Sequence, residues 1–123
     1  MIEPNFVLLY VANPPASATF YEKLLGRAPI ESSPTFAMFP LTGGVMLGLW
    51  SRETVEPAPH SATGCGELAF TAPDAAAVDA THSQWRERGL RILQAPTDLD
   101  FGRTFLALDP DGNRLRVFAP AAA

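Results

Sequence analysis

The stretch Asp109–Asn113, which reads Asp-Pro-Asp-Gly-Asn, lies between two apolar runs, Thr104–Leu108 and Leu115–Phe118. Proline at its second position fixes φ near the value that a turn needs, and glycine and asparagine tolerate positive φ. The stretch therefore predicts a hairpin turn between two strands. Such a turn sets the register of the following strand, and register decides which of its side chains point inward. The functional interpretation depends on one of those side chains, Arg116.

The composition is that of an ordinary globular protein. The chain has 123 residues, of which 47% are hydrophobic and 18% are charged, and this size corresponds to one domain-sized unit. The formal net charge is −4, and the absence of a basic cluster argues against nucleic acid as a partner. No apolar run reaches about 18 residues, so we expect no membrane span and no membrane partner.

Two features of the sequence bear on the compartment. The first residues carry no positive charge ahead of an apolar core, so we expect no secretory signal peptide. The one cysteine, Cys65, cannot form a disulfide within the chain. Both observations suit a reducing compartment, and we expect a cytoplasmic protein.

The order of the predicted elements repeats once, because each half reads strand, helix and three strands. The first half has a strand at 6–11, a helix at 16–25 and strands near 29–31, 35–39 and 45–50. The second half has a strand at 67–71, a helix at 75–88 and strands at 91–93, 104–108 and 115–118. This order predicts an internal duplication. We expect a single domain over residues 1–123, with module one at about 1–51, a linker at 52–65 and module two at 66–123.

Three passages resemble motifs of the vicinal oxygen chelate superfamily, which includes glyoxalase I, extradiol dioxygenases, fosfomycin resistance enzymes and bleomycin resistance proteins. The motifs are V-x-N, S-x-x-F-Y and L-L-G within residues 11–26, E-L-A-F at 67–70, and D-P-D-G-N at 109–113. The resemblance implies an α+β fold in which two βαβββ modules form a curved, half-open barrel around a cavity. It also implies a homodimer and, in the family's enzymes, a divalent metal held by side chains from four strands.

The four positions that match those metal ligands carry Phe6, Gly48, Glu67 and Arg116. Phenylalanine and glycine offer no donor atom, and arginine carries only N–H donors and stays protonated. A hard cation needs several oxygen ligands, so one carboxylate beside a guanidinium does not hold a metal. We therefore predict a protein with no metal site and no cofactor.

No catalytic group replaces the metal. The histidines, His60 and His82, fall in the linker and on the second helix, and Cys65 precedes a strand with no histidine near it in sequence. We therefore predict no catalytic residue. A metal-dependent lyase, isomerase or dioxygenase of the glyoxalase type remains the alternative, as does a non-catalytic interaction domain with a filled cavity.

Glu67 and Arg116 should lie on neighbouring strands and face the same cavity, where they would form a charge-assisted pair. One interpretation is an ion pair that only fills the vacated metal positions. The other is that Arg116 meets a polar or anionic group of a ligand.

The remaining candidate positions are aromatic or apolar. Residues of equal parity on a strand share a face, and this alternation supplies most of the set. The candidate ligand-binding residues are Phe6, Leu8, Tyr10, Phe36, Gly48, Trp50, Glu67, Phe101 and Arg116. An apolar pocket with a few polar groups is typical of a small-molecule site, although the same aromatics can instead form core or a dimer interface. We predict a metal-independent protein that binds an antibiotic or metabolite, with a small aromatic or cationic ligand.

Overall fold

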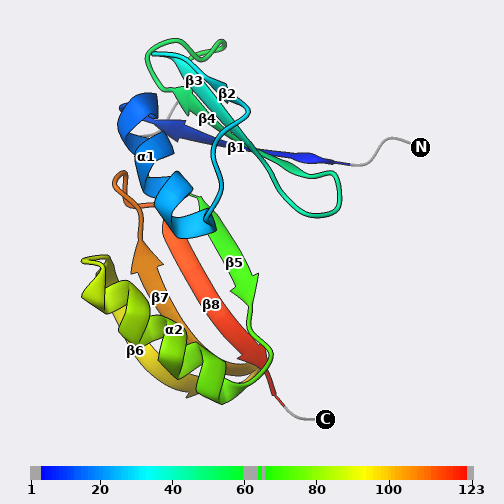
Figure 1. Ribbon diagram of the computed structural model, residues 1–123, viewed down its shortest axis with the longest axis vertical. Coiled ribbons are helices and arrows are strands. Elements are labelled where there is room, and N and C mark those ends of the chain that lie inside the picture. Colours follow the sequence, from blue (N-terminus) through cyan, green and yellow to red (C-terminus); the bar gives the residue numbers. More distant parts are fainter. Residues whose placement is uncertain (1–3, 60–63, 65, 122–123) are drawn as a thin grey trace. The chain divides into compact units, whose positions relative to one another are not determined.

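The computed structural model describes residues 4–59, 64 and 66–121. His60 and Cys65 lie outside the described residues. The chain divides into two compact units, residues 1–64 and 65–123, which we call unit one and unit two (Figure 1). No helix of the described residues is long and apolar enough to cross a membrane.

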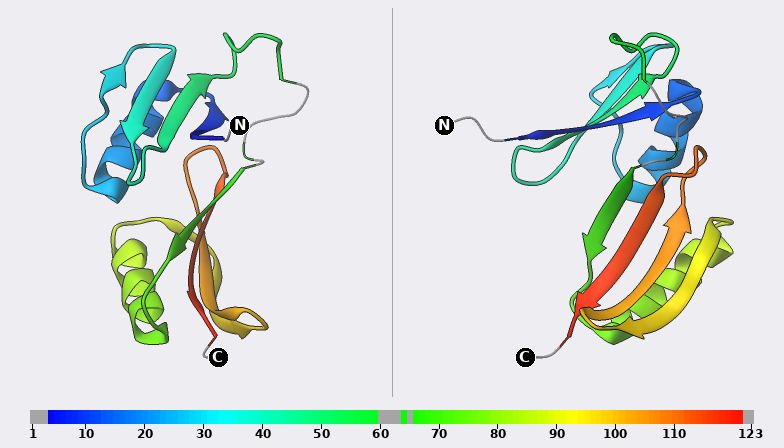
Figure 2. Two further views of the ribbon diagram at one scale, coloured as in Figure 1. Left: turned by 90° about the vertical axis from the view of Figure 1, so that its right-hand side faces the viewer. Right: turned by 180° about the vertical axis from the view of Figure 1, so that it is seen from behind.

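Unit one is a four-stranded sheet with one helix. Its elements are β1 (Phe6–Val11), α1 (Pro14–Leu25), β2 (Glu31–Ser32), β3 (Phe36–Pro40) and β4 (Met46–Ser51). The strand order is β1-β4-β3-β2, with β1 parallel to β4 and the other pairs antiparallel. Helix α1 packs against β3 and β4 and covers one face of the sheet (Figure 2).

Unit two repeats this arrangement. Its elements are β5 (Glu67–Thr71), α2 (Ala75–Glu87), β6 (Arg91–Leu99), β7 (Gly102–Leu108) and β8 (Arg114–Pro120). The strand order is β5-β8-β7-β6, and α2 packs against β6, β7 and β8. The predicted α+β fold of two βαβββ modules is confirmed, and the strands form separate open sheets that are not closed into a barrel.

Both helices begin at capping residues that the sequence supplies. Asn13 accepts a hydrogen bond from the Ala16 amide at 3.0 Å, and two prolines occupy the first helical positions of α1. Helix α1 therefore begins at Pro14, two residues before the predicted start, because proline suits the first turn of a helix. Asp74 caps α2 by accepting a hydrogen bond from the Ala77 amide at 2.8 Å.

Strand β6 is the element whose length the sequence did not predict. It extends to Leu99, although only residues 91–93 were expected to be a strand. Its register against β7 shifts between Ile92 and Gln94 and again between Gln94 and Thr97. Such bulges let an edge strand continue past Pro96, which has no amide hydrogen to donate.

The core of each unit lies between the helix and the covered face of the sheet. In unit one the fully buried side chains include Tyr21, Phe39 and Leu47. In unit two the Trp85 ring of α2 lies 5.3 Å from the ring of Phe105. The alternate residues of every strand point to the opposite face of their sheet, and these faces carry the candidate sites.

The turn at Asp109–Asn113 joins β7 to β8 and also holds the start of β5. The Asp109 carboxylate accepts hydrogen bonds from the amides of Asp111 (2.9 Å) and Asn113 (2.8 Å) and from the Asn113 side-chain amide (3.0 Å). The Asn113 side-chain oxygen accepts one from the Gly66 amide at 3.0 Å. Positive φ occurs here only at Gly112, so Asn113 contributes through its side chain and not through its backbone conformation.

Candidate functional site

The face of the unit-one sheet that α1 leaves uncovered carries apolar side chains. Strand register places Gly48 beside Leu8 on β1 and Met38 on β3, and it places Trp50 beside Tyr10 and Phe36. Directly opposed residues on neighbouring strands share a face. These side chains therefore form one continuous apolar surface.

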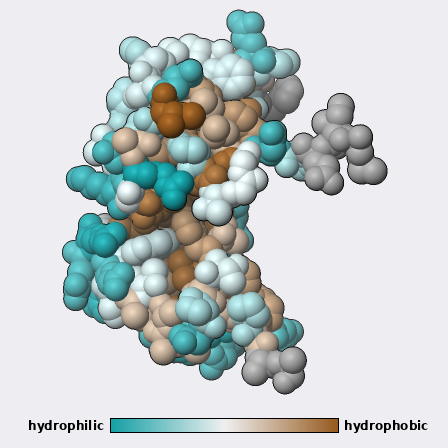
Figure 3. Space-filling model, turned by 45° about the vertical axis from the view of Figure 1, so that its right-hand side comes forward, coloured by the Kyte–Doolittle hydropathy of each residue, from teal (hydrophilic) through white to brown (hydrophobic). Residues whose placement is uncertain are grey.

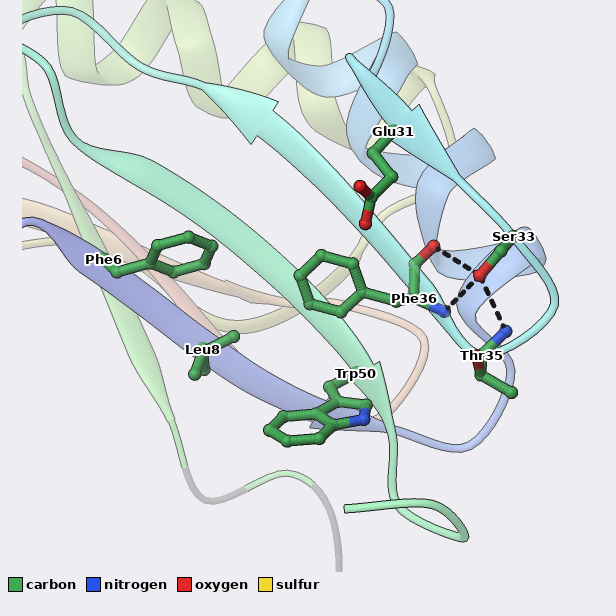
Figure 4. Close-up of a pocket in the computed structure, with 7 residues that line it drawn as sticks. All are labelled: Phe6, Leu8, Glu31, Ser33, Thr35, Phe36 and Trp50. Carbon is green, nitrogen blue, oxygen red and sulfur yellow. Dashed lines mark hydrogen bonds between the residues drawn. The ribbon is translucent and has the colours of Figure 1, made fainter. Parts of the chain in front are cut away.

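A cavity of about 510 Å³ opens on this face. It is lined by Phe6, Leu8, Glu31, Ser33, Thr35, Phe36 and Trp50 (Figure 4). Apolar side chains reach the molecular surface in patches between hydrophilic ones (Figure 3), and Phe6 and Leu8 are 41% and 43% exposed. The size and lining match those of small-molecule sites, which typically measure about 300–1,000 Å³.

The aromatic rings of this face are held at right angles to one another. The Trp50 ring lies 6.4 Å from Phe36 at an interplanar angle of 89° and 6.5 Å from Tyr10 at 81°. Edge-to-face contacts of this kind are favoured by the ring quadrupoles. Tyr10 therefore supports Trp50 from outside the cavity.

The polar groups of the cavity come from β2 and from the segment that joins β2 to β3. The Ser33 hydroxyl accepts hydrogen bonds from the Thr35 and Phe36 amides at 3.3 and 3.1 Å, so it serves the local turn. The Glu31 side chain is exposed and makes no hydrogen bond or ion pair with the described residues. Its carboxylate is therefore available to a cationic or hydrogen-bonding group of a ligand.

Gly48 lies beneath the cavity and does not line it. A Cβ atom at this position would come within 2.6 Å of Leu8 Cδ2, 2.7 Å of Phe6 Cε1 and 3.1 Å of Phe36 Cζ. Gly48, which the sequence suggested as a ligand-binding residue, is thus covered by the ends of three side chains. The glycine lets those side chains lie close to the sheet, and this sets the depth of the cavity.

Unit two carries the ion pair that the sequence suggested. Arg116 Nε donates to Glu67 Oε2 at 3.1 Å, and Arg116 Nη1 donates to the hydroxyl of buried Thr104 at 3.3 Å. That hydroxyl in turn donates to the Val117 carbonyl at 2.9 Å. Glu67 and Arg116 therefore share one hydrogen bond and not two, and Thr104 holds the guanidinium through a second nitrogen atom.

The candidate residue Phe101 and the charged residue Arg103 also lie in unit two. Phe101 is 46% exposed, and its ring lies 6.0 Å from that of Phe118. Arg103 joins α2 to β6 through hydrogen bonds to Asp79 (2.8 Å) and Asp98 (3.1 Å). The hydrogen bond to Asp79 is the larger cause, and the hydrogen bond to Asp98 the next, of a pKa of Arg103 above its usual value. Arg103 therefore stays charged and connects α2 to β6.

The residues at the family's metal-ligand positions do not fit a metal ion. Phe6 and Gly48 offer no donor atom, and the Glu67 carboxylate is engaged by Arg116. In the part of the chain that the structure describes, no three His, Cys, Asp or Glu side chains are grouped so that they could hold a metal.

Sequence reasoning missed several residues of these sites. Glu31 reaches the cavity from the two-residue edge strand β2, and Ser33 and Thr35 reach it from the turn between β2 and β3, across which strand parity cannot be followed. Thr104 could have been found, because the hairpin register pairs it with Phe118 and pairs its neighbour on that face, Leu106, with Arg116.

A family model described as the Glyoxalase/Bleomycin resistance protein/Dioxygenase superfamily matches residues 4–117 of the chain. The chain belongs to this superfamily. This finding confirms the resemblance that the three sequence passages carried.

Individual proteins are similar to the chain over nearly its whole length. The chain is 31% identical over 121 residues to the phenazine antibiotic resistance protein EhpR of Enterobacter agglomerans, covering 94% of this chain and 91% of the relative. Protein ATC0852 of Agrobacterium tumefaciens, solved by NMR, is 53% identical with a TM-score of 0.90, covering 99% of this chain and 100% of the other. TnmS3, an antibiotic binding protein from a Streptomyces species, shares the fold at 21% identity and a TM-score of 0.75, with 98% of each chain covered.

Proposed function

We propose that this protein binds a small planar aromatic antibiotic or metabolite, without a metal ion, in the apolar cavity of unit one. The observation that carries the proposal is the 510 Å³ cavity with Phe6, Phe36 and Trp50 in its wall. Flat rings stack on aromatic side chains, and each such pair contributes about 0.5–1.5 kcal/mol beyond the area that it buries. The relation to a phenazine antibiotic resistance protein supports a ligand of this shape, because phenazine is a planar three-ring system.

Binding alone is sufficient for such a role, since a bound antibiotic is withdrawn from its target. The donor set in the family's ligand positions supports metal independence, because its one carboxylate is paired with a guanidinium. The open cavity also favours a binder over an interaction domain whose cavity is filled. We further propose a homodimer, as the family implies, and light scattering measures the oligomeric state. The one cysteine, which cannot form a disulfide within the chain, supports a cytoplasmic location.

The proposal is tested by equilibrium dialysis of the protein against phenazine, with and without EDTA. We expect saturable binding that EDTA does not change. Trp50→Leu should weaken binding about tenfold, because it removes the largest ring of the wall. Trp50 lines the cavity, so phenazine should quench the fluorescence of the wild type more strongly than that of Trp50→Leu.

Ile30→Ala is the matched control, because Ile30 is an exposed apolar side chain of unit one (58% exposed) that does not line the cavity. Its affinity for phenazine should equal that of the wild type. Loss of binding on EDTA treatment would contradict metal independence. Equal weakening by both substitutions would contradict the assignment of the cavity.

A further inference from the structure

The cavity of unit one has a single charged side chain among the described residues that line it, and this side chain is Glu31. We propose that Glu31 is the specificity-determining residue of the cavity, which selects planar aromatic ligands with a positive charge and excludes those with a carboxylate. The inference rests on the proposed function and deepens it, because it names the charge of the ligand and the residue that recognises it.

Strand register places Glu31 on the face of the sheet that carries the cavity. Glu31 of β2 pairs with Met38 of β3, and Met38 pairs with Gly48 of β4. Directly opposed residues share a face, so the Glu31 side chain lies at the β2 end of a row that crosses this face. Figure 4 shows its carboxylate directed from β2 toward the ring of Phe36. A ligand whose rings lie against Phe36 therefore brings one of its edges close to the carboxylate.

The Glu31 carboxylate has no counter-ion among the described residues. No ion pair joins it to any of their side chains. The cationic residue nearest to it in the sequence, Arg27, instead donates a hydrogen bond to the Pro40 carbonyl at 2.7 Å. A cationic ligand therefore gains a charge-assisted contact with Glu31 without breaking an ion pair of the protein.

The aromatic wall of the cavity also favours a positive charge. The π face of an aromatic ring attracts a cation that lies within about 6 Å, and tryptophan does so most strongly. Trp50 and Phe36 both line the cavity, and their ring centroids lie 6.4 Å apart. A carboxylate is repelled by the ring faces and by the like charge of Glu31. The same lining therefore attracts a cationic ligand and disfavours an anionic one.

The exposure of Glu31 sets the size of the effect. Glu31 is exposed, and water weakens an ion pair at such a position to about a fivefold effect on affinity. Attraction of a cation and repulsion of an anion act in opposite directions. Two ligands of equal shape and opposite charge should therefore differ by about twentyfold in affinity.

The test is equilibrium dialysis with three ligands that share one ring system. N-methylphenazinium is positively charged, phenazine is neutral and phenazine carboxylate is negatively charged. We expect the wild type to bind them in that order of decreasing affinity, with a step of about fivefold between neighbours. Glu31→Gln, which keeps the shape of the side chain, should bring the three affinities to within about threefold of one another. Glu31→Lys should reverse the order.

Glu22→Lys is the matched control, because it makes the same change of charge at an exposed position of α1 that does not line the cavity. It should keep the order of the wild type. Circular dichroism of each variant reports whether it is folded.

The failure of this inference is distinguishable from that of the proposed function. Equal affinities of the wild type for the three ligands, an unchanged order in Glu31→Lys, or a reversed order in Glu22→Lys would each overturn the role of Glu31. Each of these results leaves the binding of phenazine intact. Failure of all three ligands to bind would overturn the proposed function and the inference with it.

Discussion

Replacing Asp109 with alanine should lower the free energy of unfolding by roughly 3–5 kcal/mol, because the change leaves several buried donors without an acceptor. Asp109 is 2% exposed, and its carboxylate accepts three hydrogen bonds from Asp111 and Asn113. Asn113 in turn binds the Gly66 amide. Loss of Asp109 therefore loosens the turn and also the anchor that holds the start of β5 beside β8.

Urea unfolding followed by circular dichroism measures this change. Asp74→Ala is the matched control, because Asp74 caps α2 through one exposed hydrogen bond to Ala77, and the loss of a cap typically costs about 1 kcal/mol. An Asp109→Ala variant that is no less stable than Asp74→Ala would show that the turn network contributes little. Asp109→Asn should fall between them, since its side-chain oxygen can still accept from both backbone amides.

The fold was largely predictable because local signals agreed with one another. Strand β1 and strand β5 have the bounds that apolar runs indicated, and Gly26 ends α1 at the predicted place with φ of 70°. Strand β6 was not predictable to its full length. Its continuation depends on backbone pairing with β7 through two register shifts. Residues 94–99 include polar residues and a proline, so their sequence does not indicate such pairing.

The candidate sites were predictable only where strand parity applies. Parity placed Phe6, Leu8 and Trp50 on one face, and the structure brings them to one cavity. It could not find Glu31, which reaches the cavity from a short edge strand. The net charge of −4 does not give the charge of a single sheet face, because Arg114 and Arg116 share one face of the unit-two sheet.

Replacing Gly48 with leucine should weaken the binding of phenazine by at least about thirtyfold, which corresponds to roughly 2 kcal/mol. The Cβ atom alone would lie 2.6 Å from Leu8 Cδ2 and 2.7 Å from Phe6 Cε1. The ends of these side chains are flexible, so they can move away from the sheet into the cavity, and the new side chain follows them. Because the displaced side chains then occupy the cavity, too little volume remains for an aromatic ligand, even though no residue that lines the cavity has been replaced.

Gly44→Ala separates this effect from a general loss of stability. Gly44 precedes β4 with φ of 81°, and a Cβ atom there would meet nothing within 4 Å. Alanine in that backbone conformation costs roughly 1 kcal/mol of stability, but the cavity keeps its volume, so the affinity for phenazine should not change. Equilibrium dialysis at a temperature below the unfolding midpoints of both variants compares their affinities for phenazine.

If Gly48→Leu binds phenazine as tightly as Gly44→Ala does, the ligand does not occupy the space above Gly48, and the aromatic face of unit one has another role. If only Gly48→Leu loses binding, then the small residue at the position that matches a metal ligand of the family's enzymes is what makes room for the ligand.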